Sequence, residues 1–308
     1  MVMSTTATRA FTGNSRKHAL FVAFLVISSL AFYRTLGAVI RYSLASSDSS
    51  SHIVLIPIIS LVLLFVERHR IFSITRTCIA FGAGLGLLGI FLYWLVNRRS
   101  FPREGNWQLS LETLCVVLVW IAGFLLCYGF VALRAAAFPL LFLLLMVPLP
   151  DVILDRAIYA LQAGSTEISY LIFQVVGTPV SRHGFLLSVP GVTIEVAKEC
   201  SSIRSSIALF ITCLLAAHLY LRTFWKKLAF VILGLLLSVV KNGIRITTLT
   251  LLSVYVDPGF LTGRLHRQGG FVFFLLALLL LLPVFVWMER SDKPRGLSAP
   301  DARAIQKL

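Results

Sequence analysis

Charged residues are scarce in this sequence. Only 13% of its 308 residues are Asp, Glu, Lys or Arg, whereas a soluble domain carries about 25%. The hydrophobic share of 58% also excludes a disordered chain. Cysteine is scarce as well, and its five positions show no CxxC or Cys/His metal spacing, which excludes a disulfide scaffold. The composition instead indicates a polytopic membrane protein built as one bundle.

Long apolar runs make up much of the sequence. Eight of them approach the length that crosses a hydrocarbon core of about 30 Å, so the predicted fold class is all-α, a polytopic integral membrane bundle of about eight transmembrane helices. The segment 157–180 mixes apolar residues with Gln, Ser and Glu, which is typical of an amphipathic interfacial helix. We expect a transmembrane domain over 18–289 between basic cytoplasmic tails at 1–17 and 290–308. The eight runs are Ala19–Tyr33, Ser49–Val66, Thr77–Val96, Thr113–Leu133, Ala135–Pro150, Ile203–Leu221, Leu228–Val256 and Gln268–Met288.

The net charge of +15 comes from Lys and Arg residues whose distribution indicates the membrane topology. Eight spans place both termini on one side, and that side then holds more Lys and Arg than the other, which is typical of the cytoplasm. Basic residues near a membrane contact anionic lipid, and no compact basic domain lies outside the apolar runs. We therefore expect the lipid bilayer as a partner and no nucleic acid.

Three basic residues, Arg204, Lys241 and Arg245, lie inside apolar runs, where charge is costly and usually faces a cavity or the bundle interior. Arg245 follows the start of its helix near Lys227 by 18 residues, or about 27 Å, which places it near the outer interface. Cys200 directly precedes the sixth predicted helix and His266 the eighth, on either side of the Arg245 helix in the sequence, and both lie at the same outer side. Topology alone therefore predicts that a cysteine, an arginine and a histidine meet at one membrane face.

This grouping suits nucleophilic catalysis. A helix N-terminus and a nearby cation both favour the thiolate form of cysteine. Cys200 is therefore a candidate nucleophile, His266 a candidate base and acid, and Arg245 a candidate binder of an oxyanion or a carboxylate. Three alternatives stay open: Cys115 could pair with Cys200 as a structural disulfide, His52 or His183 could replace His266, and Arg245 could snorkel to lipid headgroups.

Several segments, in this order, resemble the motifs of the exosortase/archaeosortase family. Ser202 departs from the family pattern, which commonly has glycine there, and the weaker S-H-G-x-x-x-P element lacks its glycine. The matching segments are Val196-Ala-Lys-Glu-Cys200-Ser-Ser-Ile-Arg204-Ser for the cysteine motif, Asn242-Gly-Ile-Arg245-Ile for N-x-x-R-[IV], His266-Arg-Gln-Gly269-Gly for H-x-x-G, Phe138 through Pro150, Leu161-Gln162, Gly184, Val189-Pro-Gly191, and Ser51-His52 with Pro57.

The resemblance implies an integral-membrane cysteine peptidase/transpeptidase with Cys200, Arg245 and His266 as its catalytic residues and with no metal or organic cofactor. Its partners would be exported, membrane-anchored proteins that end in a sorting signal of a short motif, a transmembrane helix and a basic tail. Cleavage would take place on the outer face of a bacterial inner membrane, linked to exopolysaccharide or surface-protein production.

Two other function classes remain open at this point. A transporter or exopolysaccharide export component would bind an anionic substrate through Lys241 and Arg245, with Cys200 structural. A non-enzymatic scaffold would depend on none of the candidate catalytic residues.

Overall fold

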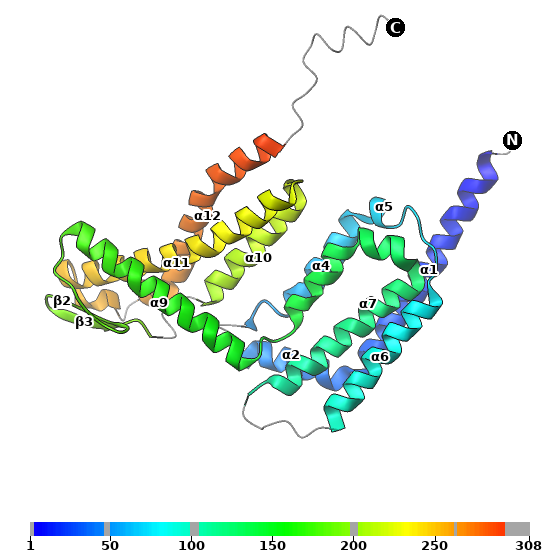
Figure 1. The fold of residues 1–308 in the computed structure, drawn as a ribbon, viewed down its shortest axis with the longest axis horizontal. Helices are drawn as coiled ribbons and strands as arrows, with labels where there is room; N and C mark the ends of the chain where they lie inside the picture. Colours follow the sequence, from blue (N-terminus) through cyan, green and yellow to red (C-terminus); the bar gives the residue numbers. More distant parts are fainter. Residues whose placement is uncertain (1–2, 46–49, 99–104, 198–202, 262–263, 293–308) are drawn as a thin grey trace, which may run out of the picture. The chain divides into compact units, whose positions relative to one another are not determined.

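The computed structural model describes residues 3–45, 50–98, 105–197, 203–261 and 264–292 (Figure 1). Within these ranges, the side chains of 3–14 and 261–269 are not part of the description. The chain forms two compact units, Met1–Asp155 and Arg156–Leu308. The elements of the first unit are α1 (Met3–Ala31), α2 (Tyr33–Ala45), α4 (Leu55–Val66), α5 (Arg68–Ile71), α6 (Ile79–Arg98), α7 (Trp107–Ala135), α8 (Ala137–Phe142), the 3-10 helix η1 (Leu143–Met146) and the start of α9 (Asp151–Val176).

The second unit contains most of α9, a small sheet and three long helices. These elements are β1 (Ser181–His183), β2 (Leu186–Val189), β3 (Val192–Glu195), α10 (Ile203–Tyr220), α11 (Phe224–Tyr255), the 3-10 helix η3 (Pro258–Leu261) and α12 (Arg264–Asp292).

The predicted helical membrane architecture is confirmed. Within the described ranges, five helices are long and apolar enough to cross a membrane: α6, α7, α10, α11 and the Gly270–Asp292 part of α12. The number rises to seven if two bent pairs, one of α1 with α2 and one of α8–η1 with α9, each count as one span. The described residues thus give between five and seven spans rather than the predicted eight, and the cytoplasmic location of both termini stays a prediction.

Three of the eight expected spans differ in the structure. The run Ala19–Tyr33 extends across the break between α1 and α2, which are bent by 76° as a pair. The other two differences have a physical reason in the sequence. In the run Ser49–Val66, α4 has only 12 residues and is about 18 Å long, which is shorter than the hydrocarbon core. In the run Ala135–Pro150, α8 and η1 end at Met146. Pro148 and Pro150 follow, and proline cannot donate the backbone hydrogen bond that would extend a helix.

In the first unit, α6 and α7 pack closely along their length. Two glycines of α6 make the approach possible: a Cβ atom at Gly82 would lie 2.7 Å from the backbone of Leu126, and one at Gly89 would lie 2.9 Å from Val119 Cγ2. Small residues allow such contacts between membrane helices. Cys115 lies in α7 as a buried free thiol, so the alternative disulfide with Cys200 is not formed.

The helix expected over 157–180 is present as α9, although it begins earlier and ends at Val176. The sequence analysis did not predict the three-stranded antiparallel sheet that follows, in the order β1-β2-β3. Its last turn contains Pro190 and Gly191, and Gly191 adopts a φ of 87°, which is the left-handed conformation that a Pro-Gly turn requires. Alternate strand residues, with Leu187 and Val189 among them, are buried against α9 and the second half of α11.

Candidate active site

The three long helices of the second unit bring three chain segments to one end of the bundle. α10, α11 and α12 all contact one another and lie side by side in Figure 1. Residues 221–223 join the first pair and 256–263 the second, and such short connections make neighbouring helices antiparallel. The start of α10, the end of α11 and the start of α12 therefore lie at the same end.

Hydrogen bonds to Asp292 fix the opposite end of these helices. The Asp292 carboxylate accepts hydrogen bonds from the backbone N–H of Thr223 at 3.1 Å and from its Oγ1 at 2.6 Å, and it pairs with Lys226 at 3.3 Å. A carboxylate at a helix N-terminus satisfies the free N–H groups there. The last residue of α12 is thus tied to the first turn of α11.

A buried lysine sets the register between α10 and α11. Lys241 of α11 is only 2% exposed, and its Nζ donates a hydrogen bond to Ser205 Oγ in the first turn of α10. Arg245 lies one turn further along α11, toward the end where α10 begins. Its side chain is partly buried, and its Nε atom is inaccessible to solvent. Arg245 lies ten residues before the end of α11 at Tyr255, and its place near the outer membrane interface stays a prediction.

Cys200 falls in residues 198–202, outside the described part of the chain, but both neighbouring segments are described. On one side, Val196 is 1% exposed, donates its N–H to Phe185 O at 3.0 Å and accepts a hydrogen bond from Gln162 Nε2 at 2.9 Å. On the other side, α10 begins at Ile203. The described chain therefore leads into the cysteine motif from a buried, hydrogen-bonded residue, Val196, and continues after the motif as α10.

His266 lies in the first turn of α12, since the helix begins at Arg264. The sequence analysis expected it just before a helix starting at Gln268, so the boundary was placed four residues late. The His266 side chain is outside the description. Of the two alternatives, His183 lies exposed in β1, and His52 lies in the first unit, before α4.

Polar contacts between α9 and α11 hold the N-x-x-R motif, which begins at Asn242. These contacts were not among the predictions from the sequence. Asn242 Nδ2 donates to Ser165 Oγ at 2.9 Å, and Ser169 Oγ donates to the backbone oxygen of Gly243 at 3.2 Å. A Cβ atom at Gly243 would lie 2.4 Å from Ile168 Cγ2, so the two helices cross at a glycine. The available signal was the repeat of small polar residues, four apart, along an otherwise apolar helix.

A protein-family match covers most of the chain. The family described as transmembrane exosortase (Exosortase_EpsH) matches residues 44–283, which is more than half of the chain. This chain belongs to the transmembrane exosortase family. No curated protein and no solved structure matches it. The family consists of membrane transpeptidases or proteases that act on the sorting signals of substrate proteins, and this exosortase is accordingly a multi-pass membrane protein.

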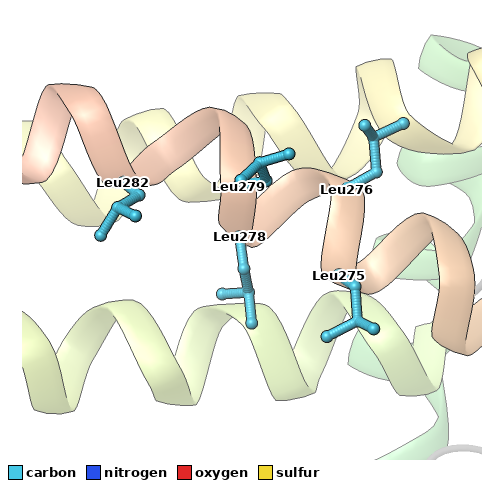
Figure 2. A pocket seen from close by; sticks show the side chains of 5 residues that line it. All are labelled: Leu275, Leu276, Leu278, Leu279 and Leu282. Atoms are coloured by element: carbon cyan, nitrogen blue, oxygen red, sulfur yellow. The ribbon is translucent and has the colours of Figure 1, made fainter.

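A hollow on α12 is lined by none of the candidate catalytic residues. It has a volume of about 590 Å³, and Figure 2 shows the five leucines of α12 that line it. The hollow offers no polar side chain for chemistry, so it is no competing reaction site. Its lining residues are Leu275, Leu276, Leu278, Leu279 and Leu282.

Proposed function

We propose that this exosortase is a cysteine peptidase/transpeptidase of the bacterial inner membrane, and that it cleaves C-terminal sorting signals on the extracytoplasmic face. Cys200 is the nucleophile, Arg245 stabilises the oxyanion, and His266 transfers the proton. The substrates are exported proteins that end in a short motif, a transmembrane helix and a basic tail, and that serve exopolysaccharide or surface-protein production.

The meeting of three helix ends carries this proposal. Cys200 lies three positions before Ile203, and three extended residues span at most about 11 Å, so the thiol is tethered close to the first turn of α10. That turn touches Lys241, and Arg245 follows one turn beyond it on α11. His266 enters from the first turn of α12, which packs against both other helices.

The proposed reaction assigns one step to each residue. The Cys200 thiolate attacks the carbonyl carbon of the scissile peptide, and the Arg245 guanidinium donates hydrogen bonds to the oxygen that gains the negative charge. His266 then gives a proton to the departing amine, the C–N bond breaks, and a thioester remains on Cys200. Water or a surface amine attacks the thioester and passes its proton to His266, the C–S bond breaks, and the Cys200 thiolate is released.

The sidedness of the site gives the first prediction. Because α10 spans between them, reporter fusions at Val192 and at Arg222 should report opposite sides of the membrane, with Val192 outside the cytoplasm. An alkaline phosphatase fusion, active only outside, should work at Val192 and fail at Arg222, and a cytoplasmic reporter should behave the other way round. The same side at both positions would refute the proposed orientation.

Deletion of the gene tests the function itself. In a strain that lacks the chain, tagged proteins ending in motif, helix and basic tail should stay full-length in the membrane fraction. Expression of the wild-type chain should restore a shortened form whose new C-terminus, read by mass spectrometry, lies before the transmembrane helix. Equal processing in the deletion strain would overturn the proposal. It would favour the alternative in which the protein is a transporter that binds an anionic substrate through Lys241 and Arg245.

A further inference from the structure

The sheet of the second unit ends in an edge strand that leads to the cysteine motif. β3 pairs with β2 on one side, and within the described residues no strand pairs with its other side. Glu195, the end of β3, lies five positions before Cys200. Edge strands present unpaired N–H and C=O groups that bind extended peptides.

The backbone hydrogen bonds of β3 show which of its N–H and C=O groups point away from β2. Val196 donates its N–H to Phe185, so it faces β2. Backbone groups alternate along a strand, so Ile194 and Val192 also face β2, whereas Thr193 and Glu195 face away. The Glu195 oxygen accepts the N–H of Ala197 at 2.9 Å. Apart from this oxygen, the groups of β3 that point away from β2 are the N–H and C=O of Thr193 and the N–H of Glu195.

This edge is fixed relative to Arg245. The buried face of the sheet, with Val192 and Ile194 of β3, packs in one cluster with Ile246 of α11, which is the residue after Arg245. The Gln162 amide holds the other end of the strand through Val196. A peptide bound along β3 is thus held at a constant distance from the guanidinium.

We propose that the sorting-signal segment preceding the substrate's transmembrane helix binds as a fourth strand beside β3 and parallel to it. This inference rests on the proposed function, since it places the substrate of the same site. Thr193 and Glu195 supply three backbone hydrogen bonds to the substrate.

The direction follows from chain order. β3 is followed by the cysteine motif and then by α10, which enters the membrane. The substrate has the same order of extended motif, scissile bond and membrane helix. A parallel strand therefore brings the scissile bond toward Cys200 while the substrate helix enters the membrane beside α10. Mixed sheets with one parallel pair are common.

β1, the other edge strand, suits this role less well. It has only three residues, and its central Arg182 pairs with Glu167 of α9 and also donates to the Gly184 oxygen at 3.2 Å. Short, charged edge strands resist strand addition. β1 also ends 17 residues before Cys200.

Two variants of the sheet test the enzyme side of this inference. Thr193→Pro removes the outward N–H, and its ring obstructs a neighbouring backbone, while the bonds between β2 and β3 remain. Ser188→Ala, in β2, loses only the hydroxyl bond that Thr193 Oγ1 donates at 3.0 Å and leaves every backbone group of β3 in place. We expect Thr193→Pro to slow processing of a tagged wild-type substrate at least tenfold and Ser188→Ala to process normally. Normal processing by Thr193→Pro would overturn the proposal.

A proline scan of the substrate gives a measurement that is independent of how the variant enzyme folds. In a strand, only every second N–H faces the neighbouring strand. Proline placed in turn at each position before the cleavage site should therefore block processing by the wild-type chain at alternate positions, and alanine at the same positions should not. A sensitivity without this two-residue period would refute strand addition, whereas loss of processing of the unmodified substrate would refute the proposed function instead.

Discussion

Cells that carry Cys200→Ala should accumulate full-length, membrane-anchored substrate and show no detectable conversion to the shortened form. Without the thiol no thioester forms, and the remaining groups cannot attack a peptide bond. We expect conversion to fall by at least about four orders of magnitude, or about 5.5 kcal/mol in activation free energy. Cys200→Ser should be nearly as inactive, since a hydroxyl is a far weaker nucleophile than a thiolate at neutral pH. The measurement is conversion of a tagged substrate followed on a gel.

Cys213 supplies the matched control. It lies in α10, the helix that follows Cys200 in the sequence, where it is 1% exposed in a cluster with Leu209 and Phe230, and nothing assigns it a chemical role. Cys213→Ala should process substrate at the wild-type rate. A membrane-impermeant thiol reagent should label wild-type Cys200 and leave Cys213 untouched, because Cys213 is buried. Wild-type conversion by an abundant Cys200→Ala chain would rule out the thiol mechanism.

The helices could be predicted from the sequence because apolar length alone determines whether a segment can span. α6, α7, α10, α11 and α12 all coincide with predicted runs. The prediction failed where length was misjudged: α4 is short, and prolines end η1 before the run does. Helix starts were also placed late, as at His266, because a helix begins in polar residues that hydropathy does not register.

The small sheet and the contacts of the site could not be predicted in the same way. Strands of three or four residues are too short for a two-residue alternation to stand out. The bond from Lys241 to Ser205 joins residues 36 apart, and the bond from Asn242 to Ser165 joins residues 77 apart, so both depend on tertiary packing. The order of the helices could nevertheless be predicted, and it determines that the start of α10, the end of α11 and the start of α12 meet. The catalytic roles of Cys200, Arg245 and His266 stay a prediction.

Arg245→Lys should lower conversion by about two to three orders of magnitude, although the charge is kept, since removal of one oxyanion donor typically costs this much. Arg245 lies on a helix held in place by Asn242 and Gly243 contacts with α9, so its planar fork is presented in one orientation. Lysine offers a point charge on a flexible stem and cannot donate two parallel hydrogen bonds to one site. Arg222→Lys, at the opposite end of α10 and exposed, is the control and should behave as wild type.

The kinetic form of the Arg245→Lys defect identifies the role of the guanidinium. An oxyanion donor acts only in the transition state, so kcat should fall while KM stays within about twofold. Since the three residues act on one intermediate, Arg245→Lys combined with His266→Ala should be little worse than the worse single variant. A rise in KM at unchanged kcat would instead show that Arg245 binds a carboxylate of the substrate, and that the oxyanion is stabilised elsewhere.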